Sequence, residues 1–402
     1  MAEAVRTVLH INVRLERGGA ARIARNLATQ LSGRGYGGQL VYGYGPRAGT
    51  SPEEESTGAL RLTSRPRAGA NAAVHKVTGR EVVRPARARM EQLHRSAVHS
   101  DVVHLHVLHS FLGPARPLVE SMIATGRPVV WTLHDSWTIT GRCAITGGCR
   151  RWVVGCGSCP DRSAYPGALL DLTRSGARRR RGWISALDGV TFVAPSEHTA
   201  ADFRAAYPGH RVRCIHNGAD PEFSRPPDAL TPLQQRRGFA LVAEDLSDPQ
   251  KVPPRVVSSL LTAGVPLVMI GRHCPYEGPL VTDVGPLTGR RRLAEVLGRC
   301  QALLFLSQID VFSLTVLEAL VGGVPVLALD SAGAREALSP LGIETMTESS
   351  LVTAARDGGE WAGHPHRDPV ELAAAASTLY STQAMAGRYA DLYDELLGTS
   401  AQ

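Results

Sequence analysis

The sequence predicts an α/β fold of two similar domains, each built on a doubly wound parallel sheet. Short apolar runs rich in β-branched residues alternate with longer segments of helical periodicity, which is typical of parallel sheets. The alternation occurs twice, first from the N-terminus and again from Phe239 onward. A polar, proline-rich segment at residues 218–238 separates the two series and is expected to be a linker.

Length and composition agree with this prediction. The chain has 402 residues, of which 43% are hydrophobic and 20% charged, so it can bury the cores of two or three globular domains. It contains no run of 18 uninterrupted apolar residues, and its first residues lack the pattern of a signal peptide. We therefore expect a soluble, cytoplasmic protein.

The net charge of +7 raises the question of a nucleic-acid or membrane partner. The excess is almost entirely arginine, because the two lysines are Lys76 and Lys251. The one tight run, residues 178–181, is expected to be an exposed helix face rather than an anion-binding patch. The other basic residues are scattered, so we expect no nucleic-acid partner, and peripheral association with a membrane stays open.

The first predicted domain covers residues 1–217. A strand at residues 5–13 leads through a Gly-containing loop into a helix at residues 22–35, which a glycine ends. Further strands are LVYGY, VVHLHVL, VVWTLHD and GVTFVAPS. Residues 45–71 are rich in Gly, Pro, Ser and charge and are expected to be a surface loop.

The second predicted domain covers residues 239–380. Its strands are FALVAEDL, PLVMIGR, QALLFLS and VPVLALD, with helices such as RRRLAEVLGRC between them. Residues 381–402 show helical periodicity only, and we expect this C-terminal helix to pack back on the first domain.

Strand ends are the places to search for a site, since ligands of parallel sheets bind beyond the carboxyl ends of the strands and two facing sheets enclose a cleft. Behind QALLFLS, Ser313 is predicted to cap a short helix. The amides of Ser313, Leu314 and Thr315, with the helix dipole, then form an anion site worth about 0.3 to 2 kcal/mol per charge. Glu318 lies little more than one turn further, where its carboxylate could accept hydrogen bonds from ribose hydroxyls.

A wider set of residues around this helix shares a spacing known from one enzyme family. Together they resemble the donor-binding signature of the retaining nucleotide-sugar glycosyltransferases of family 4, which have the GT-B architecture of two Rossmann-like domains facing a cleft with C-terminal helices crossing back. The set is Asp310, Phe312, Glu318, Ala319, Gly323, Pro325, Val326, Gly333 and Glu336. The match departs where the family has Glu, Gly and Gly, because this chain has Asp310, Ser313 and Ala332.

The resemblance extends along the chain. Gly18 and Gly19 correspond to the family's Gly-Gly loop beside the donor phosphates, and His134, followed by Asp135, corresponds to a His that contacts the donor sugar. Lys251 stands where the family has a Lys that neutralises the diphosphate.

Two further sets of residues bear on the site. The family's usual Arg, five residues before the Lys, is Leu246 here, and Arg272 could supply the missing charge. His104, His106 and His109 suggest a metal, but no carboxylate joins them at a recognisable spacing, so we expect them to be a polar lining of the cleft.

Four cysteines fall in a Gly-rich loop at residues 141–160. Cys143, Cys149, Cys156 and Cys159 are spaced C-x5-C-x6-C-x2-C, which suits a structural zinc ion that could contribute about 10 to 16 kcal/mol to folding. Disulfides are less expected in a reducing compartment. This segment also resembles a subset of bacterial family 4 enzymes that includes colanic-acid-type polysaccharide glycosyltransferases.

The resemblance implies a retaining transfer of a hexose-type sugar from a UDP-, GDP- or dTDP-sugar to a small-molecule or oligosaccharide acceptor, with no catalytic divalent metal. Lys251 and the Ser313 helix terminus would stabilise the leaving diphosphate, while His134 and Asp310 orient the sugar and Glu318 the ribose.

An Arg-rich composition typical of a GC-rich genome favours natural-product glycosylation. The alternatives are a cell-surface polysaccharide glycosyltransferase, a nucleotide-sugar epimerase or phosphorylase of the same fold, and a catalytically silent nucleotide-sugar-binding subunit. A zinc-dependent nucleic-acid binder is less favoured, and the sequence does not determine the oligomeric state.

Overall fold

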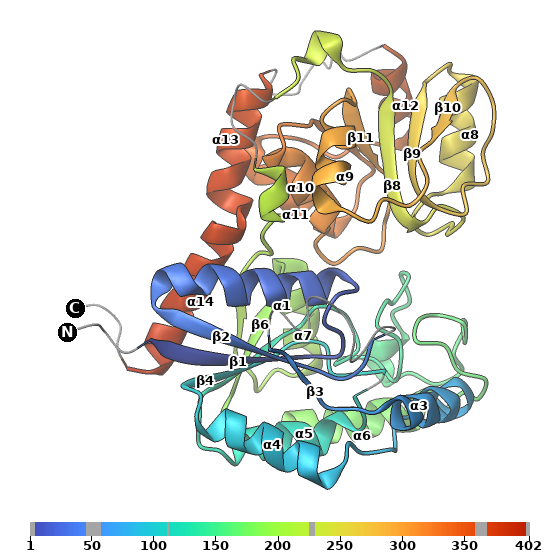
Figure 1. Cartoon of the computed structure of the whole chain (residues 1–402). Helices are drawn as coiled ribbons and strands as arrows, with labels where there is room; N and C mark the ends of the chain where they lie inside the picture. Colours follow the sequence, from blue (N-terminus) through green and yellow to red (C-terminus); the bar gives the residue numbers. More distant parts are fainter. Residues whose placement is uncertain (1–4, 46–57, 111, 225–229, 358–367, 399–402) are drawn as a thin grey trace. The chain divides into compact units, whose positions relative to one another are not determined.

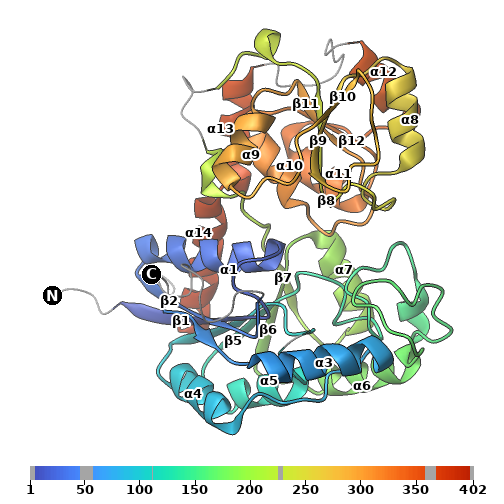
Figure 2. The same ribbon diagram turned by 45° about the vertical axis from the view of Figure 1, so that its right-hand side comes forward.

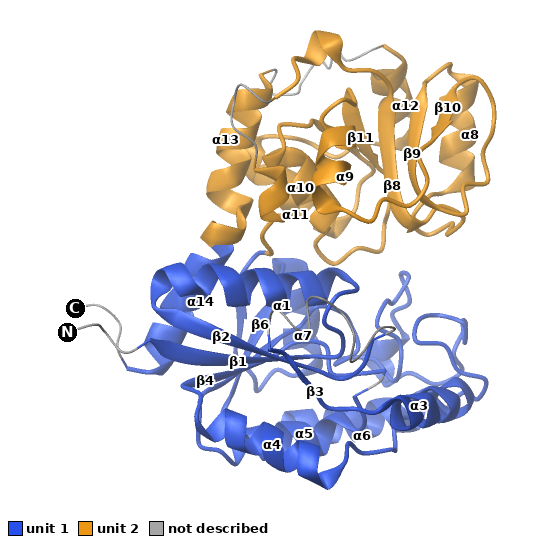
Figure 3. Cartoon of the chain, in the orientation of Figure 1, with its two compact units in different colours: residues 1–216, 385–402 blue, residues 217–384 orange. Residues whose placement is uncertain are grey.

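The structure is a computed structural model that divides into two compact units (Figure 3). The first unit comprises residues 1–216 and 385–402, and the second comprises residues 217–384. The described residues are 5–45, 58–110, 112–224, 230–357 and 368–398.

The first unit is built on a seven-stranded parallel sheet with the strand order β3-β2-β1-β4-β5-β6-β7. Its strands are β1 (Arg6–Asn12), β2 (Tyr36–Tyr42), β3 (Leu60–Arg61), β4 (Val102–Leu105), β5 (Val129–Thr132), β6 (Val190–Ala194) and β7 (Val212–Cys214). The helices that connect them are α1 (Gly19–Gln30), α3 (Arg65–Thr78), α4 (Arg87–Val98), α5 (Ala115–Ile123), α6 (Thr173–Ser185) and α7 (Glu197–Ala206), with short 3-10 helices at η1 (Leu31–Arg34) and η2 (Arg151–Val154). In Figures 1 and 2, α1 lies on one face of this sheet and α3 to α6 lie on the other, so the sheet is doubly wound.

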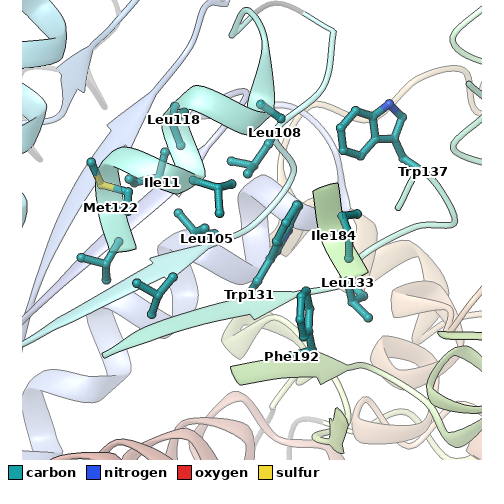
Figure 4. Close-up of a cluster of buried hydrophobic side chains, with 14 of the residues drawn as sticks. Ile11, Leu105, Leu108, Leu118, Met122, Trp131, Leu133, Trp137, Ile184 and Phe192 are labelled. Carbon is teal, nitrogen blue, oxygen red and sulfur yellow. The ribbon is translucent and has the colours of Figure 1, made fainter. Parts of the chain in front are cut away.

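Large apolar side chains fill the space between this sheet and the helices on one of its faces (Figure 4). Trp131 of β5 stacks near Phe192 of β6, with ring centroids 5.8 Å apart. The Trp131 indole nitrogen also donates a hydrogen bond to the backbone oxygen of His106, at 3.0 Å. The central strands are buried on both faces, as their continuous apolar runs predict.

The C-terminal helices α13 (Pro369–Tyr380) and α14 (Thr382–Leu396) follow one another directly. From Met385 onward the chain belongs to the first unit, where α14 is hydrogen-bonded to four strands of the sheet, β1, β2, β4 and β5. These bonds join Tyr393 to His104, Tyr389 to Thr132, and Asp394 to both Arg6 and Tyr36, at 2.5 to 2.8 Å. The prediction that the C-terminal helices cross back is confirmed.

The second unit is built on a five-stranded parallel sheet with the strand order β10-β9-β8-β11-β12. Its strands are β8 (Phe239–Asp245), β9 (Leu267–Arg272), β10 (Val281–Asp283), β11 (Ala302–Phe305) and β12 (Val326–Ala328). Its helices, besides α13, are α8 (Pro254–Thr262), α9 (Arg290–Leu297), α10 (Leu314–Val321), α11 (Ala332–Leu338) and α12 (Glu348–Arg356), with 3-10 turns η3 (Pro221–Phe223), η5 (Leu233–Gln235) and η6 (Ser339–Leu341). Leu303 and Leu304 of β11 contribute to separate apolar clusters, because successive side chains point to opposite faces of a strand and both faces are covered.

Several local predictions need correction. Of residues 45–71, those that the structure describes from 58 onward include β3 and the start of α3, whereas 46–57 lie outside the described residues. Pro66 stands in the first turn of α3, where proline favours a helix, so its presence indicated a helix start rather than a loop. Helix α1 begins at Gly19, earlier than the expected residue 22.

The arginine run on α6 is exposed only in part. Arg178 and Arg179 face solvent, but the Arg180 guanidinium lies 3.6 Å from the centroid of the Trp137 ring and donates to the backbone oxygens of Trp137 and Thr140. Burial lowers the pKa of Arg180 to about 10. The expectation of a fully exposed face was therefore wrong, because the aromatic ring and free carbonyls of the neighbouring loop accommodate this side chain.

Residues 218–238 belong to the second unit. Phe223 and Arg236 are both almost completely buried, and Arg236 donates hydrogen bonds to the backbone oxygens of Thr231 and Gly323 at 2.8 and 2.9 Å. Although this segment has a polar composition, its Arg236 is buried and hydrogen-bonded within the second unit.

A membrane-spanning helix requires both length and continuous apolar character, and none of the helices described by the structure has the two together.

The bond between Tyr393 and His104 yields a stability prediction. Tyr393→Phe leaves the buried His104 Nδ1 without this partner, so we expect the free energy of unfolding to fall by about 1 to 3 kcal/mol and the Tm by roughly 2 to 10 °C. Thermal unfolding of the variant and the wild type measures the change in Tm. Tyr276→Phe is the control, since the Tyr276 hydroxyl makes no hydrogen bond within the described ranges. Equal Tm values for the two variants would contradict the role given to this bond.

Candidate active site

In the first unit, the loop behind β1 leads directly into the N-terminus of α1. Gly18 is the residue before the helix and has φ of 94°, a left-handed conformation that favours glycine. An added Cβ would meet no atom within 4 Å, so the backbone conformation rather than crowding requires glycine here. Gly19 is the first helical residue, and no side chain caps this end. The first-turn amides are thus left for solvent or a ligand.

A row of histidines runs from β1 to the end of β5. His10 Nδ1 lies 3.2 Å from His106 Nε2, and His106 Nδ1 lies 2.9 Å from His134 Nε2. His104 stacks on His106, with ring centroids 4.1 Å apart, and pairs in register with His10 across β1 and β4. We call His10, His106 and His134 the histidine row.

Burial governs the charge of these rings. It lowers the pKa of His10 to about 3 and that of His134 to about 4, and it lowers the pKa of His106 well below its ordinary value. The three rings are therefore neutral near pH 7. His104, His106 and His109 were expected to be a polar lining of the cleft, but each is at most 2% exposed, so they lie inside the first unit.

Asp135, directly behind His134, is held by its neighbours. Its carboxylate is 2.8 Å from His109 Nε2 and accepts a hydrogen bond from the backbone amide of Trp137, also at 2.8 Å. Burial alone would raise the pKa of Asp135, but His109 and the Trp137 amide outweigh burial and lower it. Asp135 is therefore an ionised, oriented carboxylate at the strand end.

In the second unit, two predicted catalytic residues meet although they are 59 positions apart. Lys251 Nζ donates to Asp310 Oδ1 at 2.6 Å. Lys251 follows β8 and Asp310 follows β11, and these strands are parallel neighbours, so their carboxyl ends lie together. About a third of the Lys251 side chain remains exposed, which leaves the ammonium accessible to an anion.

The N-terminus of α10 lies directly behind Asp310. Ser313 occupies the predicted N-cap position, but its side chain makes no capping hydrogen bond, so the helix amides are not satisfied by it. Gly333 packs against the same turn: a Cβ there would lie 2.6 Å from the Asp310 carbonyl oxygen, which only glycine avoids. The close approach of α11 therefore fixes the loop that carries Asp310.

Glu318 lies inside the second unit rather than on its surface. Its side chain is 1% exposed and forms an ion pair with Arg290, the first residue of α9. The Arg290 guanidinium also lies over the ring of Phe223, 5.0 Å from its centroid. Arg290 was not predicted, although three consecutive arginines at a helix start, in the same unit as Glu318, were a usable signal.

Two other predicted binding residues have structural partners. Phe312 is buried in the apolar core against Tyr380, with ring centroids 5.9 Å apart, so its ring is not presented to a ligand. Arg272, at the end of β9, donates to Glu244 at 2.8 Å, and no contact of the described residues joins it to Lys251.

The four cysteines of loop 141–160 share one neighbourhood. Burial is the largest cause that raises the pKa of both Cys143 and Cys156, and the nearby thiols raise it further. As placed, the four cysteines do not fit a closed zinc site. Among the described residues, groups that could hold a metal ion have at least three ligand atoms within 4.8 Å of one another, and no three of these cysteines meet that condition. We therefore assign zinc no part in the reaction. Zinc binding stays a prediction, which metal analysis of the purified protein would test.

Comparison with known proteins agrees with the fold. The chain matches the model of Glycosyltransferase Family 4 over residues 17–223. It is 33% identical over 362 residues to WcaC of Escherichia coli (strain K12), named as a colanic acid biosynthesis glycosyl transferase, covering 86% of this chain and 88% of WcaC.

Solved structures show the same architecture. The chain is similar to Anabaena Alr3699/HepE, solved in complex with UDP and glucose, with a TM-score of 0.64 and 13% identity over 97% of this chain and 100% of the other. It is also similar to AviGT4, a glycosyltransferase involved in avilamycin A biosynthesis, with a TM-score of 0.56 and 18% identity over 98% of both chains.

The two parallel-sheet units thus define a GT-B fold, and the predicted fold class is confirmed. The chain belongs to glycosyltransferase family 4.

The two ion pairs of the second unit should differ in their effect on stability. Glu318→Gln removes the fully buried charge of this pair and leaves the half-buried Arg290 unpaired, so we expect the free energy of unfolding to fall by about 2 to 4 kcal/mol. Lys251→Ala breaks a partly exposed pair and should cost less than about 1 kcal/mol. Thermal and denaturant unfolding of both variants measure the difference, and a Glu318→Gln variant as stable as the wild type would show that the pair contributes nothing to folding.

Proposed function

We propose that this glycosyltransferase is retaining, and that it transfers a hexose-type sugar from a nucleoside diphosphate sugar to a hydroxyl group of a growing polysaccharide. The observation that carries the proposal is the pair of Lys251 and Asp310 beside the N-terminus of α10. A cation and helix amides at one strand edge can bind a phosphate, and a carboxylate beside them can bind the hydroxyl groups of the attached sugar.

The diphosphate is the proposed ligand of Lys251 and of the amides of Ser313, Leu314 and Thr315. The Lys251 ammonium is a compact charge that suits a phosphate oxygen, and the helix terminus adds a favourable dipole. Gly18 and Gly19, at the open start of α1, are the proposed phosphate-side contacts of the first unit.

The sugar and the ribose are the proposed ligands of the carboxylates. Asp310 is short, and its pairing with Lys251 leaves its second oxygen, Oδ2, to accept from a sugar hydroxyl. His134 and Asp135 take the sugar contacts that the family resemblance implies. Glu318, held by Arg290, is proposed to accept from the ribose hydroxyls once the nucleotide is bound.

The reaction then needs no strong base. The bond between the anomeric carbon and the diphosphate oxygen breaks, the acceptor oxygen bonds to the same face of that carbon, and the acceptor proton passes to the departing diphosphate. Lys251 and the α10 amides stabilise the negative charge that develops on the leaving group. The protein thus contributes charge stabilisation and positioning.

The acceptor class follows from similarity. WcaC is similar to this chain over most of both lengths and is named for colanic acid biosynthesis, which supports a polysaccharide acceptor. The likeness to AviGT4, at 18% identity, concerns the fold alone and does not favour the natural-product alternative.

A donor screen with two lysine variants tests this proposal. We expect saturable binding of one UDP-, GDP- or dTDP-hexose, and Lys251→Ala should weaken it about tenfold or more, as expected for a charge-assisted bond to phosphate. Calorimetry gives the affinity, and release of free nucleotide gives the turnover.

Lys76→Ala is the matched control, because Lys76 is the other lysine of the chain and is exposed on α3 of the first unit. It should bind the donor as the wild type does. Equal weakening in both variants would contradict a specific phosphate contact, and donor binding without turnover across polysaccharide acceptors would favour the silent binding subunit.

A further inference from the structure

The histidine row of the first unit has one closed end and one open end. His10 Nε2 at the closed end is completely buried and has no hydrogen-bond partner among the residues that the structure describes. At the other end, His134 stands at the strand end and uses Nε2 for its bond to His106, so its Nδ1 is the remaining nitrogen. Both inner contacts, at 3.2 and 2.9 Å, have hydrogen-bond length.

Counting protons leaves two arrangements. The rings are buried and neutral, and the nearest carboxylate, that of Asp135, is engaged by His109. A neutral imidazole has one N–H and one bare nitrogen, so each N···N contact holds one proton. If His106 carries its proton on Nδ1, then His10 and His134 do as well; if it carries the proton on Nε2, all three carry it there. The three tautomers therefore change together.

The closed end decides between the two arrangements. With protons on Nε2, His10 would bury an N–H group that has no acceptor; with protons on Nδ1, it buries only a bare nitrogen. Orphaned N–H groups are the rarer and costlier case in protein interiors. We infer that His10 and His106 are positioning residues that fix the proton of His134 on Nδ1, so that His134 acts as a hydrogen-bond donor and not as a base.

The backbone holds this row in place. The backbone amide of His106 donates to Ile11 at 2.9 Å, and its carbonyl accepts from the Trp131 indole at 3.0 Å. The His106 ring is thereby fixed between β1 and β5, with one nitrogen toward His10 and one toward His134.

A metal ion is the competing explanation for these side chains. His10, His104 and His106 each offer a nitrogen within 4.8 Å of the others. However, both nitrogens of His104 already lie 2.7 Å from hydroxyl groups, those of Thr132 and Tyr393. No carboxylate belongs to this group to offset the charge of a divalent ion. Hydrogen bonding accounts for more of the contacts than a metal does.

The consequence for the reaction rests on the proposed function. A donor N–H at His134 suits an oxygen of the sugar or of the acceptor, and it agrees with a reaction in which the leaving diphosphate takes the proton. If His134 instead accepted a proton on Nδ1, the row would have to pass a proton on to His10 Nε2. That nitrogen is buried in the interior of the first unit, where the row ends.

Nitrogen NMR of the whole protein, labelled with 15N-histidine, reads the tautomers directly. We expect His134 to show a protonated Nδ1 and an unprotonated Nε2, and His10 and His106 to show the same pattern. The His134 signals are assigned by their loss in His134→Gln.

Two nearly isosteric variants test the positioning role. His106→Asn places an amide N–H near the position of Nδ1, so His134 should keep its proton on Nδ1 and the enzyme should keep kcat/KM within about threefold. His106→Leu removes the N–H that points at His134, so the His134 protons should redistribute between both nitrogens and kcat/KM should fall about tenfold.

Three results would overturn the inference: a His134 protonated on Nε2 in the wild type, the same His134 pattern in both variants, or a bound divalent ion that His10→Asn releases. If the protein transfers no sugar at all, the proposed function fails, but the NMR spectra still decide the tautomer.

Discussion

Every strand of both sheets runs in the same direction, and the rest of the structure depends on this constraint. Parallel strands place all their carboxyl ends, and the helix N-termini behind them, at one edge of each unit. Residues distant in sequence therefore meet there: Lys251 behind β8 with Asp310 behind β11, and His106 behind β4 with His134 behind β5. A residue of the same loops whose side chain is buried instead becomes part of the core, as Phe312 does against Tyr380.

The two units place different charges at these edges. The first unit gathers neutral histidines, whose pKa values burial lowers, and it engages its nearby carboxylate with His109. The second unit gathers ion pairs, Lys251 with Asp310 and Arg290 with Glu318, beside helix amides. Neutral donors and acceptors suit hydroxyl groups, whereas cations and amides suit phosphates. The cation and amides of the second unit therefore suit the diphosphate proposed as the ligand of Lys251 and α10.

The sequence could predict the alternation of strands and helices, the parallel sheets and the residues at strand ends, because these follow from periodicity and chain order. It could not predict partners that depend on packing. In the sequence, His10 is one polar residue in an apolar run. The pairing of β1 with β4, which the sequence does not give, places it beside His104 and close to His106. Arg180 was expected on an exposed helix face and Arg290 carried no prediction, whereas the structure shows an aromatic ring beside the first and an ion pair for the second. The cysteine spacing predicted a zinc site, and the described thiols of this loop share one neighbourhood without any three of them being close enough to form it.

The stereochemistry of the transferred sugar tests the central claim most directly. With the donor that the protein binds, proton NMR of the glycoside product gives the anomeric configuration of the new bond. Our account, in which acceptor and leaving group share one face of the sugar, predicts that an α-linked donor gives an α-linked product. A β-linked product would mean attack from the opposite face, which requires a base that this account does not provide, and would contradict it.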